Sequence, residues 1–348
     1  MRAVTIEPGK PASAMLEDVE EPAPQTGDLL ARTLAIGVCG TDSELVSGGY
    51  GEAPAGRQRL IIGHESLGTV VHAPPDSGFI AGDLVVGIVR HPDPVPCANC
   101  AVGEWDMCRN GRYTERGIKQ ADGFCSERFC ADPAFAIRLD PVIGACGVLL
   151  EPTSVVAKAW EHIEHVGRRA RWEPRRVLVT GAGPIGLLAA LLGVQRGLEV
   201  HLLDRTEKGA KPRLARELGA GYHTGSVRDL GFVPDIVIEC TGAAQVIMDV
   251  MSRNSPGAIV CLTGLSSGQH CVEVDANLLN RRMVLENDVV LGSVNANRRH
   301  YEKAAAALAK ADRRWLEGLI TRRVPLHDWR EAYERRPDQI KTVLDFTL

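Results

Sequence analysis

The stretch Arg176–Arg205 constrains the fold of this chain more than any other. It begins with the apolar run Val177–Val179, which is rich in β-branched residues and long enough for a buried strand. The glycine-rich segment Gly181–Gly186 follows and leads into an apolar run of helical character. A second apolar run, Val200–Leu203, comes after it. This order predicts a strand, a tight turn, a helix and a second, parallel strand.

The segment Gly181–Gly186 reads GAGPIG, and each of its glycines has a physical role. Gly181 allows the tight turn, and Gly183 lets the backbone approach a pyrophosphate. Gly186 lets the helix pack closely on the strand, and the helix N-terminus offers N–H groups to the anion. Pro184 and Ile185 complete the turn as candidate cofactor contacts. The sequence therefore predicts a dinucleotide-binding Rossmann unit, the alternative being a glycine-rich turn in some other α/β protein.

Asp204 ends the second strand, about 20 residues past the glycines, where a carboxylate can accept both ribose hydroxyls of NAD. Its neighbour Arg205 could instead hold the 2′-phosphate of NADP. A carboxylate aimed at the ribose repels that phosphate, so we expect NAD to be preferred and NADP to remain possible.

Length and charge narrow the class of protein. A chain of 348 residues is long enough for two domains. With 40 basic and 44 acidic residues the formal charge is −4, which argues against nucleic acid as a partner. The first residues lack the apolar core of a signal peptide, and the most apolar segment, 183–194, is too short for a membrane span. We expect a cytoplasmic protein without a membrane partner.

The two halves of the chain differ in the pattern of their apolar residues. Residues 1–155 hold short apolar segments separated by Gly, Pro and Asp, a pattern typical of an all-β domain. From Thr153 to Ile163 the periodicity is helical, which predicts a connecting helix. Further strands are expected at Asp235–Glu239, Ala258–Leu262 and Val289–Val294, with helical patterns between them. This alternation predicts a parallel, doubly wound sheet.

Cys39, His64, Glu65 and Glu151 are of the residue types that bind Zn²⁺. They are far apart in sequence, so only a fold that brings them together would make a site. A second group, Cys97, Cys100 and Cys108, has the close spacing of a metal-binding lobe.

Five motifs, in this order, resemble the zinc-dependent medium-chain dehydrogenase/reductase family: GVCGTD, GHE, CxxCxxxxxxxC, LLEP and GAGPIG. The segments 112–119, 122–129 and 292–301 most resemble its glucose dehydrogenase branch. The resemblance implies an α/β protein with a GroES-like β-barrel catalytic domain and a doubly wound Rossmann domain. The first would cover residues 1–155, with the tail from about 296 to 348 packing back on it, and the second residues 156–295. The active site would lie in the cleft between them.

The resemblance also implies roles for individual residues. Cys39, His64, Glu65 and Glu151 match the ligands of the catalytic zinc, Glu151 binding directly or through water. Thr41 matches the hydroxyl that relays the substrate proton. The remaining matches are Glu115 and His300, which would contact sugar hydroxyls, and Asn295 on the nicotinamide side. For His300, a solvated histidine at a helix end is the alternative.

The cysteine lobe departs from the family pattern of four cysteines. Cys97, Cys100 and Cys108 are present, but Pro94 stands where the first cysteine is expected, and proline has no ligand atom. Asp93 could supply the fourth donor, and so could Cys125 or Cys130. The alternative is a lobe that holds no second zinc.

Together these features predict a zinc- and NAD(P)-dependent dehydrogenase that oxidises a sugar or polyol, with glucose at C1 giving the lactone. Another polyol, a cyclitol or a biosynthetic alcohol is the alternative substrate. Two other classes stay open, a zinc-free enone or quinone reductase and a non-catalytic NAD-binding protein. Sheet-edge pairing, usual in the family, suggests a homodimer or homotetramer.

Overall fold

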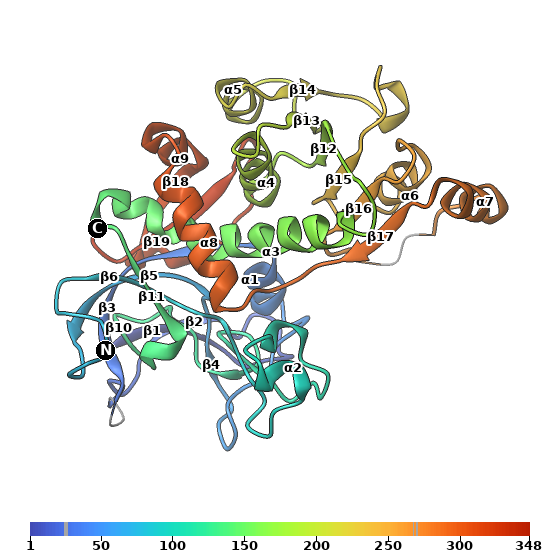
Figure 1. Ribbon diagram of the computed structural model, residues 1–348. Coiled ribbons are helices and arrows are strands. Elements are labelled where there is room, and N and C mark those ends of the chain that lie inside the picture. Colours follow the sequence, from blue (N-terminus) through green and yellow to red (C-terminus); the bar gives the residue numbers. More distant parts are fainter. Residues whose placement is uncertain (24–26, 267, 269–270) are drawn as a thin grey trace. The chain divides into compact units, whose positions relative to one another are not determined.

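The computed structural model describes residues 1–23, 27–266, 268 and 271–348 (Figure 1). The chain forms two compact units. Unit 1 comprises Met1–Ser154 and Asn295–Leu348, and unit 2 comprises Val155–Val294. The C-terminal segment therefore returns to the unit that holds the N-terminus.

Unit 1 is built mainly from β-strands. They are β1 (Arg2–Ile6), β2 (Met15–Asp18), β3 (Leu29–Val38), β4 (Leu60–Ile61), β5 (Glu65–His72), β6 (Leu84–Gly87), β7 (Arg90–His91), β8 (Thr114–Arg116), β9 (Gln120–Ala121), β10 (Arg128–Ala131), β11 (Ala136–Leu139), β18 (Ile320–Pro325) and β19 (Lys341–Asp345). The helices are α1 (Gly40–Val46), α2 (Ala98–Ala101), α8 (Arg298–Ala309), α9 (Arg313–Leu319) and α10 (Trp329–Ala332), with the short helices η1 (Trp105–Met107), η2 (Pro133–Phe135), η3 (Pro141–Leu149) and η5 (Leu326–Asp328).

The main sheet of unit 1 positions the candidate metal site. Its order is β11-β6-β5-β3-β19-β18, and β10 also pairs with β3. Gly37 near the end of β3 is the partner of Glu65 at the start of β5. On its other side β3 pairs with β19, where Val38 faces Thr342. The register thus brings the end of one strand and the beginnings of two others to one point.

Unit 2 is a six-stranded parallel sheet with helices. The elements are β12 (Arg176–Thr180), β13 (Glu199–Leu203), β14 (Gly221–His223), β15 (Ile236–Glu239), β16 (Ile259–Leu262), β17 (Val289–Gly292), α4 (Pro184–Val194), α5 (Ala210–Glu217), η4 (Val227–Asp229), α6 (Ala244–Ser252) and α7 (Ala276–Glu286). Helix α3 (Leu150–Gly167) runs across the boundary between the units. The sheet order β14-β13-β12-β15-β16-β17 reverses between β12 and β15, as in doubly wound folds.

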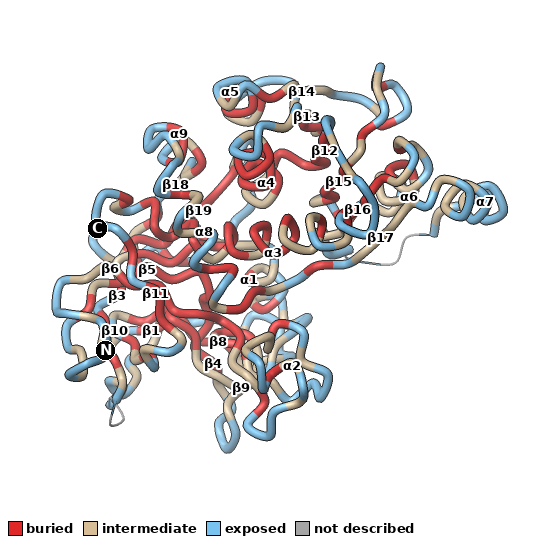
Figure 2. The backbone as a smooth tube through the Cα atoms, in the orientation of Figure 1, coloured by how far each residue is buried: buried red, intermediate tan, exposed pale blue. Residues whose placement is uncertain are grey.

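The elements of unit 2 differ clearly in how far their residues are buried (Figure 2). Strands β12 and β15 are largely buried, and α4 buries eight residues from Gly186 to Gly193. Helix α7 has no buried residue. The stretch Pro141–Gly167 is apolar and long enough to cross a membrane by composition, but 72% of its apolar window is buried inside the protein, as in a core helix.

Candidate functional site

Three predicted zinc ligands converge in unit 1. Cys39 follows β3 and caps the N-terminus of α1, while Glu65 begins β5 and His64 directly precedes it. Cys39 Sγ lies 3.1 Å from His64 Nε2. The candidate ligand atoms of Cys39, His64 and Glu65 all lie within 4.8 Å of one another. The fold therefore brings together residues that sequence spacing alone leaves apart.

Asp42 supports this cluster from the first turn of α1. Its Oδ2 accepts a hydrogen bond of 2.9 Å from the Cys39 backbone N–H, and its Oδ1 lies 3.3 Å from His64 Nδ1. Burial favours neutral His64, but the charges of Cys39 and Asp42 outweigh burial and hold the pKa of His64 well above its usual value. A carboxylate on Nδ1 orients the ring so that Nε2 faces the cluster, as in metal-bound histidines.

Lys341 is part of the cluster and was missed by sequence reasoning. It begins β19, is 1% exposed, forms an ion pair with Glu65, and donates a 3.1 Å hydrogen bond to the Val38 carbonyl. The available signal was a lysine at the start of the apolar run KTVLDF, where a charge needs a buried partner.

Two glycines make room for these side chains. A Cβ on Gly37 would lie 2.0 Å from Glu65 Oε2 and 3.0 Å from Lys341 Cε. Gly63, which precedes His64, has φ of +85°, and a Cβ there would lie 2.8 Å from Cys125 Cβ. Both positions in GVCGTD and GHE are therefore closed to larger residues.

Glu151 lies in the first turn of α3, near the cluster but outside the group whose ligand atoms lie within 4.8 Å. Burial raises the pKa of Glu151 to about 7; His64 opposes this shift and Glu65 adds to it. The buried acids Asp42 and Glu65, with the partly buried Glu151 beside them, thus place carboxylates next to one thiol and one imidazole. This donor set and charge fit a bound divalent cation such as Zn²⁺.

The residues expected to contact substrate have different environments. Thr41 is partly buried in α1. Glu115 is 5% exposed, and its Oε1 accepts hydrogen bonds from Arg90 Nε (3.0 Å), Arg90 Nη2 (2.9 Å) and Asn295 Nδ2 (2.6 Å). Sequence reasoning missed Arg90, which pairs with Glu115 across β7 and β8. Asn295, predicted to lie near the nicotinamide, donates its amide to Glu115 instead of being free.

His300 is completely buried, so it is not the solvated helix-end residue considered as the alternative. Its Nδ1 accepts a 3.1 Å hydrogen bond from the Asn297 N–H, which caps the start of α8. This contact gives the ring a structural task at the helix N-terminus.

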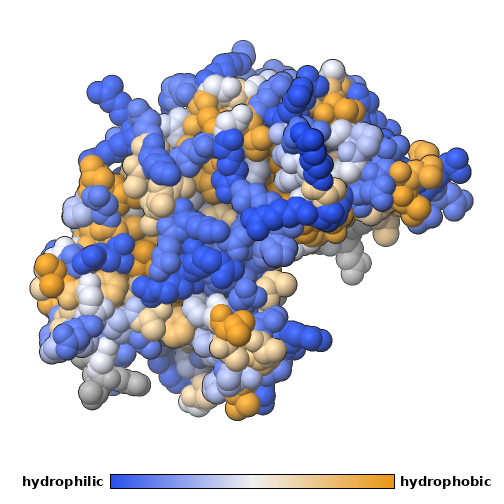
Figure 3. Space-filling model, viewed as in Figure 1, coloured by the Kyte–Doolittle hydropathy of each residue, from blue (hydrophilic) through white to orange (hydrophobic). Residues whose placement is uncertain are grey.

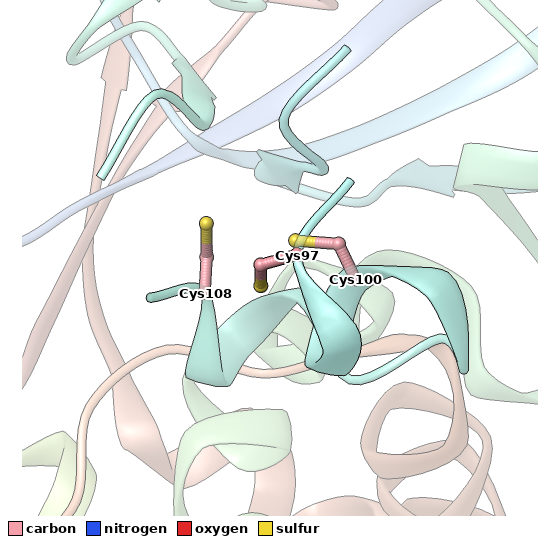
Figure 4. Close-up of side chains that lie close together, drawn as sticks. All are labelled: Cys97, Cys100 and Cys108. Carbon is pink, nitrogen blue, oxygen red and sulfur yellow. The ribbon is translucent and has the colours of Figure 1, made fainter. Parts of the chain in front are cut away.

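The cysteine lobe also assembles (Figure 4). Cys97 caps α2, Cys100 lies in α2 and Cys108 follows η1, and their sulfur atoms lie within 4.8 Å of one another. Hydrogen bonds from the N–H groups of Arg109 and Cys100 lower the pKa of Cys97 to about 6. Three clustered sulfur atoms, one of them easily ionised, are suited to a soft divalent metal.

The fourth donor of this lobe is not evident in the fold. The buried Asp93 accepts hydrogen bonds from Val95 N (2.8 Å) and Asn110 Nδ2 (2.9 Å) and pairs with Arg112. Cys125 is buried in the barrel core, and Cys130 on β10 contacts the Pro22 carbonyl. Among the described residues, neither cysteine joins the group of three.

The glycine-rich turn of unit 2 has the geometry expected for dinucleotide binding. Gly181 has φ of +87°, and Gly183 is the N-cap of α4, with Pro184 and Ile185 in its first turn. A Cβ on Gly186 would lie 1.7 Å from the Gly181 carbonyl oxygen, whereas one on Gly183 would meet open space. Gly183 therefore leaves the backbone accessible, as approach by a phosphate requires.

Asp204 faces this turn but already has partners. Its Oδ2 accepts a 2.7 Å hydrogen bond from the Ala182 N–H, and its Oδ1 a 2.9 Å bond from the Thr206 N–H. Lys211 Nζ lies 3.2 Å from Oδ2, a partner that sequence reasoning missed. Arg205 is exposed. The carboxylate that we expected to repel a 2′-phosphate is thus paired with a cation.

Fold and site together define a two-domain dehydrogenase. A family model described as "Glucose dehydrogenase C-terminus" matches residues 144–346, and one described as "Alcohol dehydrogenase GroES-like domain" matches residues 25–141. This chain belongs to the zinc-dependent medium-chain dehydrogenase family, in its glucose dehydrogenase branch. The sequence-based prediction of family and fold class is confirmed.

Individual relatives match over almost the whole chain. Glucose 1-dehydrogenase of Methanocella arvoryzae is 39% identical, with 99% of each chain covered, and glucose 1-dehydrogenase 1 of Caldivirga maquilingensis is 38% identical with the same coverage. A structure of glucose dehydrogenase from Haloferax mediterranei, in complex with NADP, Zn and gluconolactone, matches with a TM-score of 0.91 and 32% identity over 100% of both chains.

Proposed function

We propose that this chain oxidises an aldose, with glucose converted at C1 to the lactone, using zinc and a nicotinamide dinucleotide. The observation that carries the proposal is the convergence of Cys39, His64 and Glu65 in unit 1. The relative that shares this fold over its whole length contains NADP, Zn and gluconolactone, which supports the same reaction here.

The cluster would hold the zinc through Cys39, His64 and Glu65, with Glu151 beside them. When bound, zinc supplies a Lewis acid that lowers the pKa of the sugar hydroxyl, and the nicotinamide accepts a hydride. Asp42 orients His64, and Lys341 balances the charge of Glu65. Thr41 would pass the hydroxyl proton toward solvent.

Glu115 and His300 would contact sugar hydroxyls. For Glu115, among the described residues no hydrogen bond reaches Oε2, while Arg90 and Asn295 hold Oε1. An ionised carboxylate fixed on one side can present its second oxygen to a hydroxyl donor. For His300, the hydrogen bond from the Asn297 N–H to Nδ1 fixes the orientation of the ring.

Dinucleotide binding would use Gly181, Gly183 and the following turn. We propose that both NAD and NADP are accepted, with NAD preferred as the carboxylate of Asp204 predicts. Lys211, which pairs with Asp204, and the exposed Arg205 support measurable use of NADP, because cations near this carboxylate could pair with a 2′-phosphate. Asn295 is kept as a candidate on the nicotinamide side, although its amide donates to Glu115.

A second zinc in the cysteine lobe is proposed on the group of three sulfurs. Asp93 is the candidate fourth ligand, and it would have to exchange one of its present hydrogen bonds for the metal. None of the ten cysteines, all of which the structure describes, forms a disulfide, which fits the reducing, cytoplasmic setting that we propose.

We also propose that two copies associate through unit 2. Strand β17 is at the end of the sheet, and its one partner among the described residues is β16. Next to it in sequence, α7 exposes Leu278 (63%), Val284 (66%) and Leu285 (62%). Figure 3 shows apolar surface at the end of unit 2 that carries α7. An open edge beside exposed apolar side chains favours pairing with a second copy. Light scattering on the Leu285→Lys variant, compared with the wild type, tests this: a smaller assembly is expected.

A substrate panel tests the main proposal. Aldoses, polyols and cyclitols should be assayed with NAD and NADP, and the metal content measured on the same preparation. Oxidation of glucose with about one or two zinc ions per chain is expected. Turnover of a polyol, a cyclitol or another alcohol in place of glucose would correct the substrate, and enone reduction by metal-free protein would identify a zinc-free reductase.

A further inference from the structure

Glu239 is a buried acid with no role in the proposed oxidation of the sugar. It ends β15 and is 0% exposed. Strand β15 lies next to β12, at the place where the order of the sheet reverses. In doubly wound folds, ligands bind at this place, outside the carboxyl ends of the strands. Glu239 therefore lies under the edge at which a dinucleotide is expected.

The Glu239 side chain joins the ends of two strands. Its Oε1 accepts hydrogen bonds from Thr180 Oγ1 (3.2 Å) and the Thr241 N–H (2.7 Å), and it also contacts the Thr241 hydroxyl. Its Oε2 accepts a 3.1 Å hydrogen bond from the Gly242 N–H. Thr180 ends β12 directly before the glycine-rich turn, so one carboxylate connects that turn with the loop after β15.

The Glu239 backbone extends the connection to a third strand. Its carbonyl accepts hydrogen bonds from the N–H groups of Thr263 (2.8 Å) and Gly264 (2.9 Å), directly after β16. The Thr263 hydroxyl donates to the same carbonyl at 2.8 Å. One residue thus fixes the carboxyl ends of β12, β15 and β16 relative to each other.

The loops held by Glu239 pack tightly on the glycine-rich turn. A Cβ on Gly181 would lie 2.9 Å from Thr241 Cγ2. Gly242 has φ of +66°, and a Cβ there would lie 2.3 Å from the Leu265 carbonyl oxygen. Because Thr241 touches the turn and Glu239 holds Thr241, a change at Glu239 is transmitted to the backbone that approaches the pyrophosphate.

We propose that Glu239 is a positioning residue of the dinucleotide site, whose carboxylate keeps the turn at Gly181 and the loop at Thr241 in the binding conformation before the cofactor arrives. The proposal rests on the dinucleotide binding proposed above. Its physical basis is pre-organisation, since a site already held in its bound shape loses less conformational freedom on binding.

The same strand offers a matched control at its other end. Asp235 precedes β15 and accepts hydrogen bonds from the N–H groups of Arg175 (2.8 Å) and Arg176 (2.9 Å) and from Ser255 Oγ (2.6 Å). This carboxylate also joins β12 to β15, but at the amino ends of the strands, away from the ligand edge. Loss of either carboxylate should lower stability, whereas only loss of Glu239 should weaken cofactor binding.

The experiment compares Glu239→Gln with Asp235→Asn in the full chain. Titration of NADH and NADPH, followed by their fluorescence, gives the Kd without any need for turnover. We expect the Kd of Glu239→Gln to rise about tenfold, because the amide cannot accept from all of these donors. The KM for cofactor should rise with it, while the KM for sugar stays unchanged. Asp235→Asn should lower the unfolding midpoint and leave the Kd unchanged.

Thr241→Val is the second variant, and it decides the question if Glu239→Gln does not fold. It removes the hydroxyl that contacts Glu239 and should raise the Kd about threefold. A wild-type Kd in folded Glu239→Gln, or in Thr241→Val, would overturn the proposal, and so would an equal rise in Asp235→Asn. If the wild type itself binds neither NADH nor NADPH, the proposed function fails instead.

Discussion

Cys39 and His64 are the residues on which the proposed metal chemistry depends most directly. We predict that Cys39→Ser or His64→Ala loses the zinc and nearly all turnover but keeps the affinity for NAD(P)H. The reason is that both ligands belong to unit 1, whereas the glycine-rich turn belongs to unit 2. Metal analysis and NADH titration of the same sample measure both effects, with Cys130→Ser as a thiol control outside the cluster. Unchanged turnover in a metal-free variant would exclude the zinc mechanism.

Asp204 and Lys211 should have opposite effects on the choice between NAD and NADP. We predict that Asp204→Ser raises kcat/KM for NADP relative to NAD, because it removes like charge and leaves Lys211 unpaired near the ribose. Lys211→Met should lower NADP use while affecting NAD by less than about threefold. Steady-state kinetics with both cofactors checks this. If the wild type already prefers NADP severalfold, Asp204 does not bind the adenosine ribose and does not decide the choice of cofactor.

At the scale of elements, the end of β3 and the start of α1 offer two glycines for comparison. A Cβ on Gly37 would collide with Glu65, whereas a Cβ on Gly40 at the start of α1 meets nothing within 4 Å. We predict that Gly37→Ala weakens zinc binding by about tenfold or more and Gly40→Ala changes it little. Competition with a chelator measures both affinities. Equal affinity in the two variants would mean that the close approach at Gly37 does not shape the site.

The lobe formed by α2 and η1 gives a prediction of stoichiometry. If Cys97, Cys100 and Cys108 bind zinc, the chain should hold about two zinc ions, and Cys108→Ser about one. Chelation should then expose these thiols to alkylation. One zinc in the wild type, with all three thiols alkylated while the chain is folded, would show an empty lobe.

For the whole molecule, Glu151 predicts how the stability of the metal-free protein depends on pH. The pKa of Glu151 is raised from 4.5 to about 7, with burial as the main cause. Between these two pH values Glu151 is ionised in the unfolded chain but protonated in the folded one. The free energy of unfolding therefore falls as the pH rises and levels off above about pH 7. The free energy of unfolding decreases by up to roughly 3 kcal/mol over this range.

Glu151→Gln removes this dependence. Urea unfolding after chelation should show the variant more stable than the wild type at pH 8 and similar to it near pH 4.5, the usual value of a glutamate. The reverse order, with the wild type more stable at pH 8, would mean that the cluster stabilises an ionised Glu151 without a metal.

Local sequence patterns determined the architecture of this protein. Short apolar segments in residues 1–155 predicted an all-β domain, which the structure builds mainly from strands, and GAGPIG predicted the turn before α4. These features follow from chain neighbours, because periodicity and the φ freedom of glycine act over a few residues. The motifs also predicted the family, which the comparisons confirm.

Only the tertiary structure decided which side chains meet. Lys341 reaches Glu65 because β19 pairs with β3, which also pairs with β5, across some 300 residues of sequence. Arg90 fixes Glu115, and Lys211 neutralises Asp204, in the same unpredicted way. Glu239 ends a predicted strand, but its proposed positioning role follows only from the order of the sheet, which places it beside Thr180. The physical reason is that the hydrophobic pattern of a strand sets its register against a given partner, but tertiary packing decides which distant strands become partners and in what order.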